Sequence, residues 1–115
     1  MVFYREGETI LFDEWLNTLP VKVQAKCLSQ LGLLRSQGYE LRRPIADILR
    51  DGIYELRPTY QGVHYRILYF FSGKNLVVIS HGITKESQVP PIEIERALER
   101  KKKYEANPRA HGWKG

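Results

Sequence analysis

The amino-acid sequence predicts an α+β fold: an N-terminal helical hairpin packed on a small antiparallel sheet, a three-stranded meander, followed by a C-terminal helix. Three observations lead to this prediction. Apolar residues recur every three or four positions up to Gly38, which is a helical period. Residues 53–83 are rich in β-branched and aromatic side chains, which is typical of strands. After Pro90-Pro91 the helical period returns.

The helical hairpin is expected from two amphipathic segments. The first segment places these apolar residues on one helical face: Leu11, Phe12, Trp15, Leu16 and Leu19. Pro20 is suited to begin the second helix, and Gly38 is suited to end it. The apolar face predicted for this second helix consists of Val21, Ala25, Leu28, Leu31 and Leu34. Cys27, the only cysteine, lies in this helix, where we expect a buried apolar role rather than that of a nucleophile.

Three strands are expected over residues 53–57, 63–71 and 76–83. Turn residues separate them, so that short loops would join the strands into a meander. Residues 2–4 are a candidate for an additional short strand. Residues 105–115 contain proline, glycine and scattered charges. We expect them to form a flexible tail of a single domain that spans residues 1–115.

Length and composition limit the class of protein. The chain has 115 residues, enough for one domain with its own core. Its formal net charge of +5 suits an anionic partner such as nucleic acid. Because the sequence shows no signal peptide and no apolar stretch that could span a bilayer, we expect a cytoplasmic protein without a membrane partner. It also lacks a glycine-rich phosphate loop and a dinucleotide fingerprint, so no small-molecule cofactor is expected.

Pairing the predicted strands gathers polar side chains on one face of the sheet. The first turn places Arg57 opposite His64, and Glu55 opposite Arg66. The second turn places His81 opposite Arg66. The rest of this face is apolar and consists of Ile53, Leu68, Phe70, Val77 and Ile79. The opposite face carries Tyr54, Leu56, Tyr65, Ile67, Tyr69 and Val78. Helices could therefore cover one face fully while the other remains a partly open groove, although a slip of one residue would move side chains between faces.

Two arginines and two histidines on one face are suited to metal-free cleavage of RNA. A general base takes the proton of a 2′-hydroxyl, guanidinium groups stabilise the charge that develops on the phosphate, and an acid protonates the leaving 5′ oxygen. Histidine suits either proton role, and arginine can hold a phosphate through two hydrogen bonds. The alternative interpretation is structural: Glu55 and Arg66 form a simple cross-strand ion pair, and the histidines serve the fold. No metal site is expected, because the arginines would repel a divalent cation.

Several segments together resemble the RelE/ParE toxin superfamily and, within it, the HigB-like, phage-derived branch. They are residues 49–57 (LRDGIYELR), 65–69 (YRILY) and 78–85, and the helix after Pro90 with Ala97 and Tyr104. By this resemblance Arg57 and Arg66 match two arginines of the family, and Arg66 is the expected phosphate ligand. Lys85 matches the first of two lysines after the last strand and is an expected RNA contact. The second lysine is replaced by Glu86, which puts the level of activity in doubt.

The other candidate residues have different support. His64 and His81 are candidates for proton transfer on the register argument alone. Tyr69 is a candidate for stacking on an unpaired RNA base, although its position in the strand places it with the core.

The resemblance implies the toxin of a type II toxin–antitoxin pair, a metal-independent endoribonuclease that cleaves messenger RNA at the ribosome and so inhibits translation. It also implies a cognate antitoxin, commonly a helix-turn-helix protein. Two alternatives remain open at this point. The chain could be a ParE-like inhibitor of DNA gyrase, or a degenerate binding module without catalysis.

Overall fold

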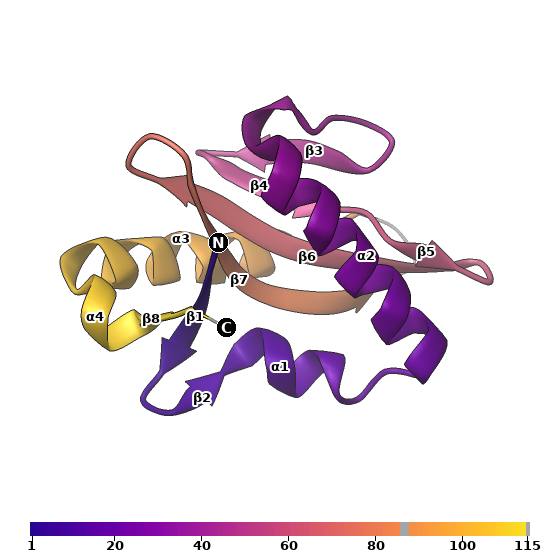
Figure 1. The fold of residues 1–115 in the computed structure, drawn as a ribbon, viewed down its shortest axis with the longest axis horizontal. Helices are drawn as coiled ribbons and strands as arrows, with labels where there is room; N and C mark the ends of the chain where they lie inside the picture. The colour runs from indigo at the N-terminus through magenta and orange to yellow at the C-terminus, as the bar shows by residue number, and fades with distance from the viewer. Residues whose placement is uncertain (86–87, 115) are drawn as a thin grey trace.

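The computed structural model describes residues 1–85 and 88–114 (Figure 1). The elements in chain order are β1 (Val2–Glu6), β2 (Thr9–Ile10), α1 (Leu11–Leu16), α2 (Val21–Gln37), a 3₁₀ turn (Gly38–Glu40), β3 (Ala46–Arg50), β4 (Ile53–Leu56), β5 (Thr59–Tyr60), β6 (Val63–Ser72), β7 (Leu76–Lys85), α3 (Pro91–Ala106), α4 (Pro108–His111) and β8 (Gly112–Trp113). Within these described ranges, no helix is long and apolar enough to cross a membrane.

The predicted fold is wrong in its sheet and in its N-terminal helices. The sheet is mixed and eight-stranded, with the order β2-β1-β7-β6-β4-β3; β5 pairs with β6, and β8 pairs with β1. The expected antiparallel meander forms only its centre, β4, β6 and β7. Strand β1 adds to β7 in parallel, which makes the sheet mixed. Helix α1 is only six residues long and packs against β7, so it does not form a hairpin with α2.

Strand β3 was missed although a local signal for it is present. Asp51 and Gly52 both have positive φ values, 52° and 80°, and they form the two-residue turn between β3 and β4. Such a turn requires glycine, asparagine or aspartate because most side chains avoid positive φ. An Asp-Gly pair before a strand therefore predicts a hairpin, and hence another strand preceding it.

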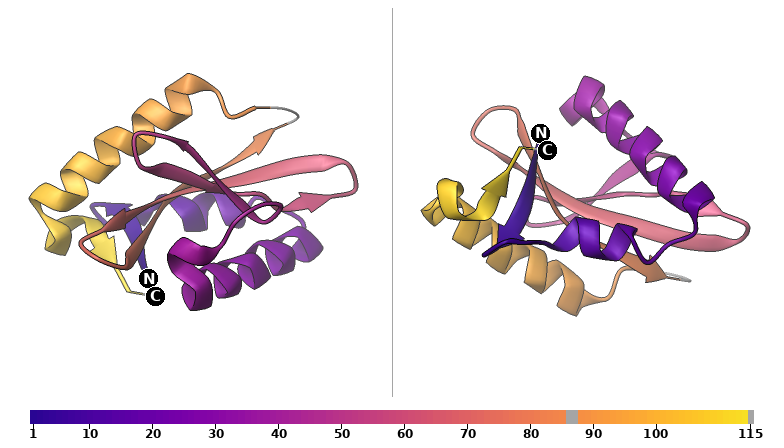
Figure 2. Two further views of the ribbon diagram at one scale, coloured as in Figure 1. Left: turned by 90° about the horizontal axis from the view of Figure 1, so that it is seen from above. Right: turned by 60° about the horizontal axis from the view of Figure 1, so that its bottom comes forward.

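Helices lie on both faces of the sheet (Figure 2). On one face, α1 and α2 bury a core that includes Phe12, Val23, Leu34, Ile67 and Tyr69. On the other face, α3 buries a second core that includes Ile53, Leu68, Phe70, Val78 and Ala97. Both faces of β6 are therefore apolar over much of its length, which explains its nearly continuous hydrophobic sequence.

Helix α2 turns only part of its predicted face to the core, where Leu31 and Leu34 are buried as predicted. Val21 and Leu28 are 79% and 52% exposed. The buried residues are Val23, Cys27, Gln30, Leu31 and Leu34. The helix carries apolar residues on two stripes, so helical periodicity alone could not determine which stripe faces the sheet. The buried position expected for Cys27 is confirmed.

Within the segment expected to be a flexible tail, α4 and β8 fold back on β1 instead. Trp113 in β8 pairs with Phe3 in β1. The ring of His111 stacks on Tyr4 with centroids 5.3 Å apart, and its Nδ1 donates to the carbonyl oxygen of Arg5 at 3.0 Å. Aromatic packing and strand pairing both hold this segment, although its composition is that of a loop.

The register after the first turn differs from the prediction by two residues. Residues 61–62 form the predicted turn, with φ values of 50° and 78°. However, His64 lies opposite Thr59 rather than Arg57, and Glu55 lies opposite Leu68 rather than Arg66. Because side chains alternate with a period of two, this offset leaves every side chain on its predicted face.

The register of the second hairpin differs by one residue near its turn. Phe70 lies opposite Val78, so Val77 and Ile79 pack with the α1–α2 core and not on the predicted face. The register then shifts at Ser80: Tyr69 pairs with Ile79, and Leu68 with His81. One extra residue in β7 is a β-bulge, and it turns His81 back toward the α3 face. His81 therefore lies on the predicted face but opposite Leu68 rather than Arg66.

Candidate active site

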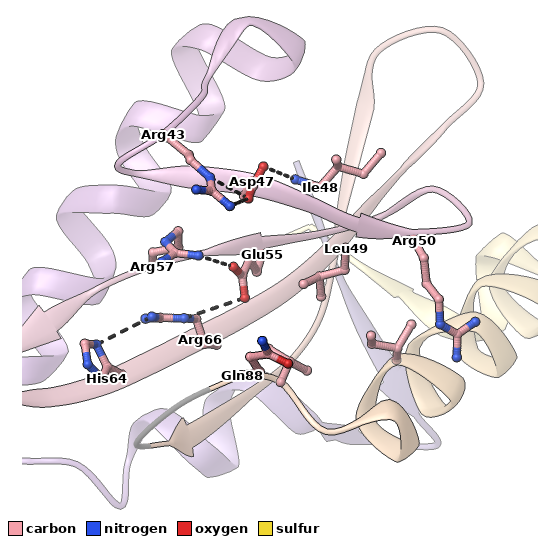
Figure 3. Close-up of a pocket in the computed structure, with 12 residues that line it drawn as sticks. Arg43, Asp47, Ile48, Leu49, Arg50, Glu55, Arg57, His64, Arg66 and Gln88 are labelled. Carbon is pink, nitrogen blue, oxygen red and sulfur yellow. Dashed lines mark hydrogen bonds and ion pairs between the residues drawn. The ribbon is translucent and has the colours of Figure 1, made fainter.

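A cavity lies at the end of the sheet face that α3 leaves open (Figure 3). Helix α3 covers the apolar end of this face, where it buries Leu68, Phe70 and Val78. The cavity has a volume of about 520 Å³ and is lined by Arg43, Asp47, Ile48, Leu49, Arg50, Glu55, Arg57, His64, Arg66, Gln88, Val89 and Ile94. Three of the four predicted catalytic residues, Arg57, Arg66 and His64, meet here.

A buried carboxylate holds the two predicted arginines. Glu55 and Arg57 are two residues apart at the end of β4, so their side chains point to the same side of the sheet. Arg57 donates from Nη1 to Glu55 Oε2 at 2.6 Å, and Arg66 Nε lies 3.6 Å from Glu55 Oε1. The Glu55 side chain is 5% exposed. A buried charge is stable only when it is paired, so the carboxylate fixes both guanidinium groups on this face.

The two arginines differ in their access to the cavity. The side chain of Arg57 is 31% exposed, whereas that of Arg66 is 6% exposed and forms part of the cavity floor. Arg66 also donates from Nη1 to the carbonyl oxygen of Tyr65 at 2.7 Å. Burial lowers the pKa of the Arg66 guanidinium from its ordinary value, and the neighbouring Glu55 opposes that shift. Arginine stays protonated in proteins because its ordinary pKa is very high, so both groups carry positive charge.

His64 completes the row of polar side chains across the cavity floor. Its Nδ1 lies 3.2 Å from Thr59 Oγ1 and 3.5 Å from Arg66 Nη2. The Thr59 hydroxyl can accept a hydrogen bond, whereas the longer contact to Arg66 is at the limit of hydrogen bonding. When Nδ1–H donates to Thr59 Oγ1, Nε2 carries the free lone pair and is the ring atom available for proton exchange.

Positive charge is concentrated at one end of the cavity. Arg43 pairs with Asp47 at 2.6 Å. Arg50 pairs with two carboxylates, Asp51 at 2.8 Å and Glu95 at 2.6 Å. By contrast, Arg57 and Arg66 share the single carboxylate of Glu55. The excess of positive charge therefore lies beside His64, where a phosphate would be attracted.

His81, the fourth predicted catalytic residue, is not brought to this cavity. It lies beneath α3 and is 7% exposed. Its Nε2 lies 3.0 Å from Glu93 Oε1, and its Nδ1 lies 2.8 Å from both Ser80 Oγ and Arg100 Nη1. Arg100 can only donate, so Nδ1 accepts and Nε2–H donates to Glu93. Burial and the charge of Arg100 lower the pKa of His81 to about 4, against the opposing effect of Glu93. At neutral pH the imidazole is therefore uncharged.

The other two predicted RNA-binding residues lie elsewhere or are only partly described. Tyr69 is 1% exposed and stacks on Tyr54 in the α1–α2 core, with ring centroids 5.4 Å apart. It therefore does not line the cavity. Lys85 is the last residue of β7 and pairs in register with His64; the structure describes its backbone only. Glu86, where the family resemblance is broken, lies outside the described residues.

Several cavity residues were not anticipated from the sequence. Arg43, Asp47 and Leu49 come from β3 and the loop before it, which were not predicted as part of the sheet. Gln88 and Val89 come from the connection between β7 and α3. The Asp-Gly turn could have indicated β3, but no sequence signal shows that the start of α3 faces β3 across the sheet. In residues 1–85 and 88–114, no group of three or more His, Cys, Asp or Glu is placed to hold a metal ion.

Comparison with known families supplies one match. The profile described as "Phage derived protein Gp49-like (DUF891)" matches residues 14–102, which is most of the chain and includes every residue that lines the cavity. No curated protein matches the chain.

Proposed function

Because the chain belongs to the Gp49-like, phage-derived family, a toxin-like family of the RelE/HigB type, we propose that it is the toxin of a type II toxin–antitoxin pair and cleaves messenger RNA without a metal ion. One observation carries the proposal of cleavage. Arg57, Arg66 and His64 converge on one cavity, at the end of the sheet face that α3 leaves open. A protein that acted only by binding another protein would not need this set of groups.

In this proposal the two guanidinium groups bind the scissile phosphate. Arg57 is the more exposed and contacts the phosphate oxygens from the cavity wall, while Arg66 does so from the floor. Negative charge grows on these oxygens as the 2′-hydroxyl attacks phosphorus, so fixed cations stabilise the transition state more than the ground state. Glu55 is a positioning residue: it holds both arginines and does not contact the RNA.

His64 transfers a proton at Nε2, either as the base for the 2′-hydroxyl or as the acid for the leaving 5′ oxygen. Thr59 orients the ring by accepting a hydrogen bond from Nδ1–H. His81 is proposed to serve the fold instead, because both of its ring nitrogens are engaged beneath α3. Lys85 remains a proposed RNA contact on the family resemblance. A helix-turn-helix antitoxin and action at the ribosome are likewise inferred from the family resemblance.

The test is induction of the protein in a bacterial host with mapping of messenger RNA 5′ ends over the first minutes. Wild type should arrest growth and produce new cuts within translated regions, and Arg66→Ala should do neither. Lys26→Ala is the matched control, since it removes one positive charge from the exposed surface of α2. Thermal unfolding of each purified variant shows whether it is folded.

Each other outcome contradicts part of the proposal. Growth arrest without cuts would favour gyrase inhibition, and the absence of arrest would favour a binding module. A folded Arg66→Ala variant that still cuts RNA would remove Arg66 from the catalytic site.

A further inference from the structure

The candidate active site has a second half whose walls are apolar. Next to the arginines and His64, the cavity is lined by Leu49 from β3, Val89 from the loop before α3, and Ile94 from α3. Ile48 also lies next to the cavity, but it pairs in register with Tyr54 of the α1–α2 core, so its side chain lies on the opposite side of the sheet. Figure 3 shows Leu49 and Gln88 on opposite walls, to one side of the Arg66–Glu55 pair.

The charges along the cavity show what each half can accept. At the apolar half, Arg50 pairs with two carboxylates, Asp51 and Glu95, which neutralise its positive charge. At the polar half, Arg57 and Arg66 share one carboxylate. A second phosphate is therefore not favoured at the apolar half. A ligand with an anionic group at one end and a neutral, flat, mostly apolar group at the other end would match both halves.

We propose that the apolar half is a nucleobase subsite. One nucleotide of the RNA lies with its phosphate on Arg57 and Arg66 and its base against Leu49 and Ile94, and the side-chain amide of Gln88 contacts the edge of the base. This inference rests on the proposed RNA cleavage and adds the substrate group that the free protein recognises. A volume of about 520 Å³ is in the range of sites that bind small ligands and can hold one nucleotide.

Gln88 is the specificity-determining residue in this arrangement. Its side chain is exposed and belongs to the cavity lining. An amide has both a donor and an acceptor, so it can pair with the complementary groups on a base edge and discriminate between bases. The walls around it are aliphatic, so they hold any base, whereas the amide distinguishes one base from another. Tyr69, expected from the sequence to stack on a base, is buried on the other face of the sheet and is not needed for this contact.

The test is to measure the binding of free nucleotides to the purified chain by calorimetry or by NMR titration. The probes are the four nucleoside 5′-monophosphates and ribose 5-phosphate, which has the same phosphate but no base. If the base is bound as well as the phosphate, at least one nucleotide should bind about tenfold more tightly than ribose 5-phosphate, which corresponds to about 1.4 kcal/mol. The variant Leu49→Ser should bring this ratio close to one, with ribose 5-phosphate affinity unchanged.

Two further variants make the result specific. Leu49→Ala is a milder change that keeps an apolar side chain, so it should stay folded, and it should reduce the same ratio by a smaller factor. Gln88→Leu should keep the advantage of nucleotides over ribose 5-phosphate but remove the differences among the four bases. Ile92→Ser is the control, because Ile92 is 54% exposed and does not line this cavity.

The inference is overturned if ribose 5-phosphate binds as tightly as every nucleotide, or if Leu49→Ser and Leu49→Ala both leave the ratio unchanged. It is also overturned if no nucleotide binds at millimolar concentration, as expected for a cavity that receives a protein side chain. The assay requires no cleavage, so its failure is distinct from failure of the proposed function. A chain that cuts messenger RNA but shows a ratio of one would lose only the nucleobase subsite.

Discussion

The two ends of the sheet face next to α3 carry the same kinds of side chain but differ in what covers them. The open end has Glu55, Arg57, His64 and Arg66 around a cavity. The covered end has Ser80 and His81 of β7 beneath the helix, and α3 itself contributes Glu93 and Arg100. Each end therefore combines a histidine with a carboxylate and arginine. Within residues 1–85 and 88–114, the cavity beside these groups lies at the open end.

The two ends have similar residue types, so the difference between a candidate catalytic site and a structural network lies mainly in whether α3 covers the side chains. At the covered end, both ring nitrogens of His81 have partners, and burial keeps the ring neutral. At the open end, Thr59 and Arg66 engage only Nδ1 of His64. We therefore expect changes at the open end to alter cleavage, and changes at the covered end to alter stability.

The largest expected effect is on the arginines. Arg66→Ala should lower the rate of messenger RNA cleavage by about 10²–10³-fold, because a fixed cation at the developing charge is removed. Arg100→Ala, the corresponding change at the covered end, should leave the rate within a few fold while the protein is folded. Cleavage of a translated messenger RNA by purified variants measures both. An equal loss of rate in the two variants would contradict the claim that only the open end takes part in cleavage.

The covered end should make stability depend on pH. The pKa of His81 is lowered from 6.5 to about 4 in the folded protein, so the unfolded chain binds a proton more readily between these values. The His81 contribution to the unfolding free energy should therefore be fully present above pH 6.5 and decrease as pH falls toward 4, at most by about 1.4 kcal/mol per pH unit. Urea unfolding across this range measures the slope. His81→Gln should flatten it, and an unchanged slope would show that other groups cause it.

The smallest expected effects concern the hydroxyl groups that contact each histidine. Thr59→Val removes the contact to His64 Nδ1 and should lower cleavage several-fold, with little change in stability. Ser80→Ala removes a buried contact to His81 Nδ1 and should lower the unfolding free energy by about 1 kcal/mol, with cleavage unchanged. Reversal of these two outcomes would contradict the roles assigned to the two ends.

The polar end of the sheet could be predicted because it depends on strand parity. Glu55 and Arg57 are two residues apart, as are His64 and Arg66, so each pair shares a face in any regular strand. The register between the strands was wrong by two residues, and an even error leaves the faces unchanged. The prediction for the apolar end was wrong for two residues. A register error of one residue at the second turn placed Val77 and Ile79 on the wrong face, and they pack in the other core.

His81 was predicted on the correct face of the sheet, but from a strand register that the structure does not have. Its face depends on a bulge at Ser80, and nothing in the local sequence indicates one. Its burial depends on α3, whose packing is decided by the second apolar core and not by the helix sequence alone. The parallel pairing of β1 with β7 was missed for a similar reason, since it joins segments more than 70 residues apart.

The central claim is that the open end performs the chemistry and the covered end holds the fold. It is tested most directly by measuring the cleavage rate and the unfolding free energy of His64→Gln and His81→Gln side by side. We predict that His64→Gln loses cleavage by about 10²-fold or more and changes stability by less than about 0.5 kcal/mol. His81→Gln should lose about 1–3 kcal/mol of stability and, while folded, cleave within a few fold of wild type. A folded but inactive His81→Gln variant beside an active His64→Gln variant would contradict the claim.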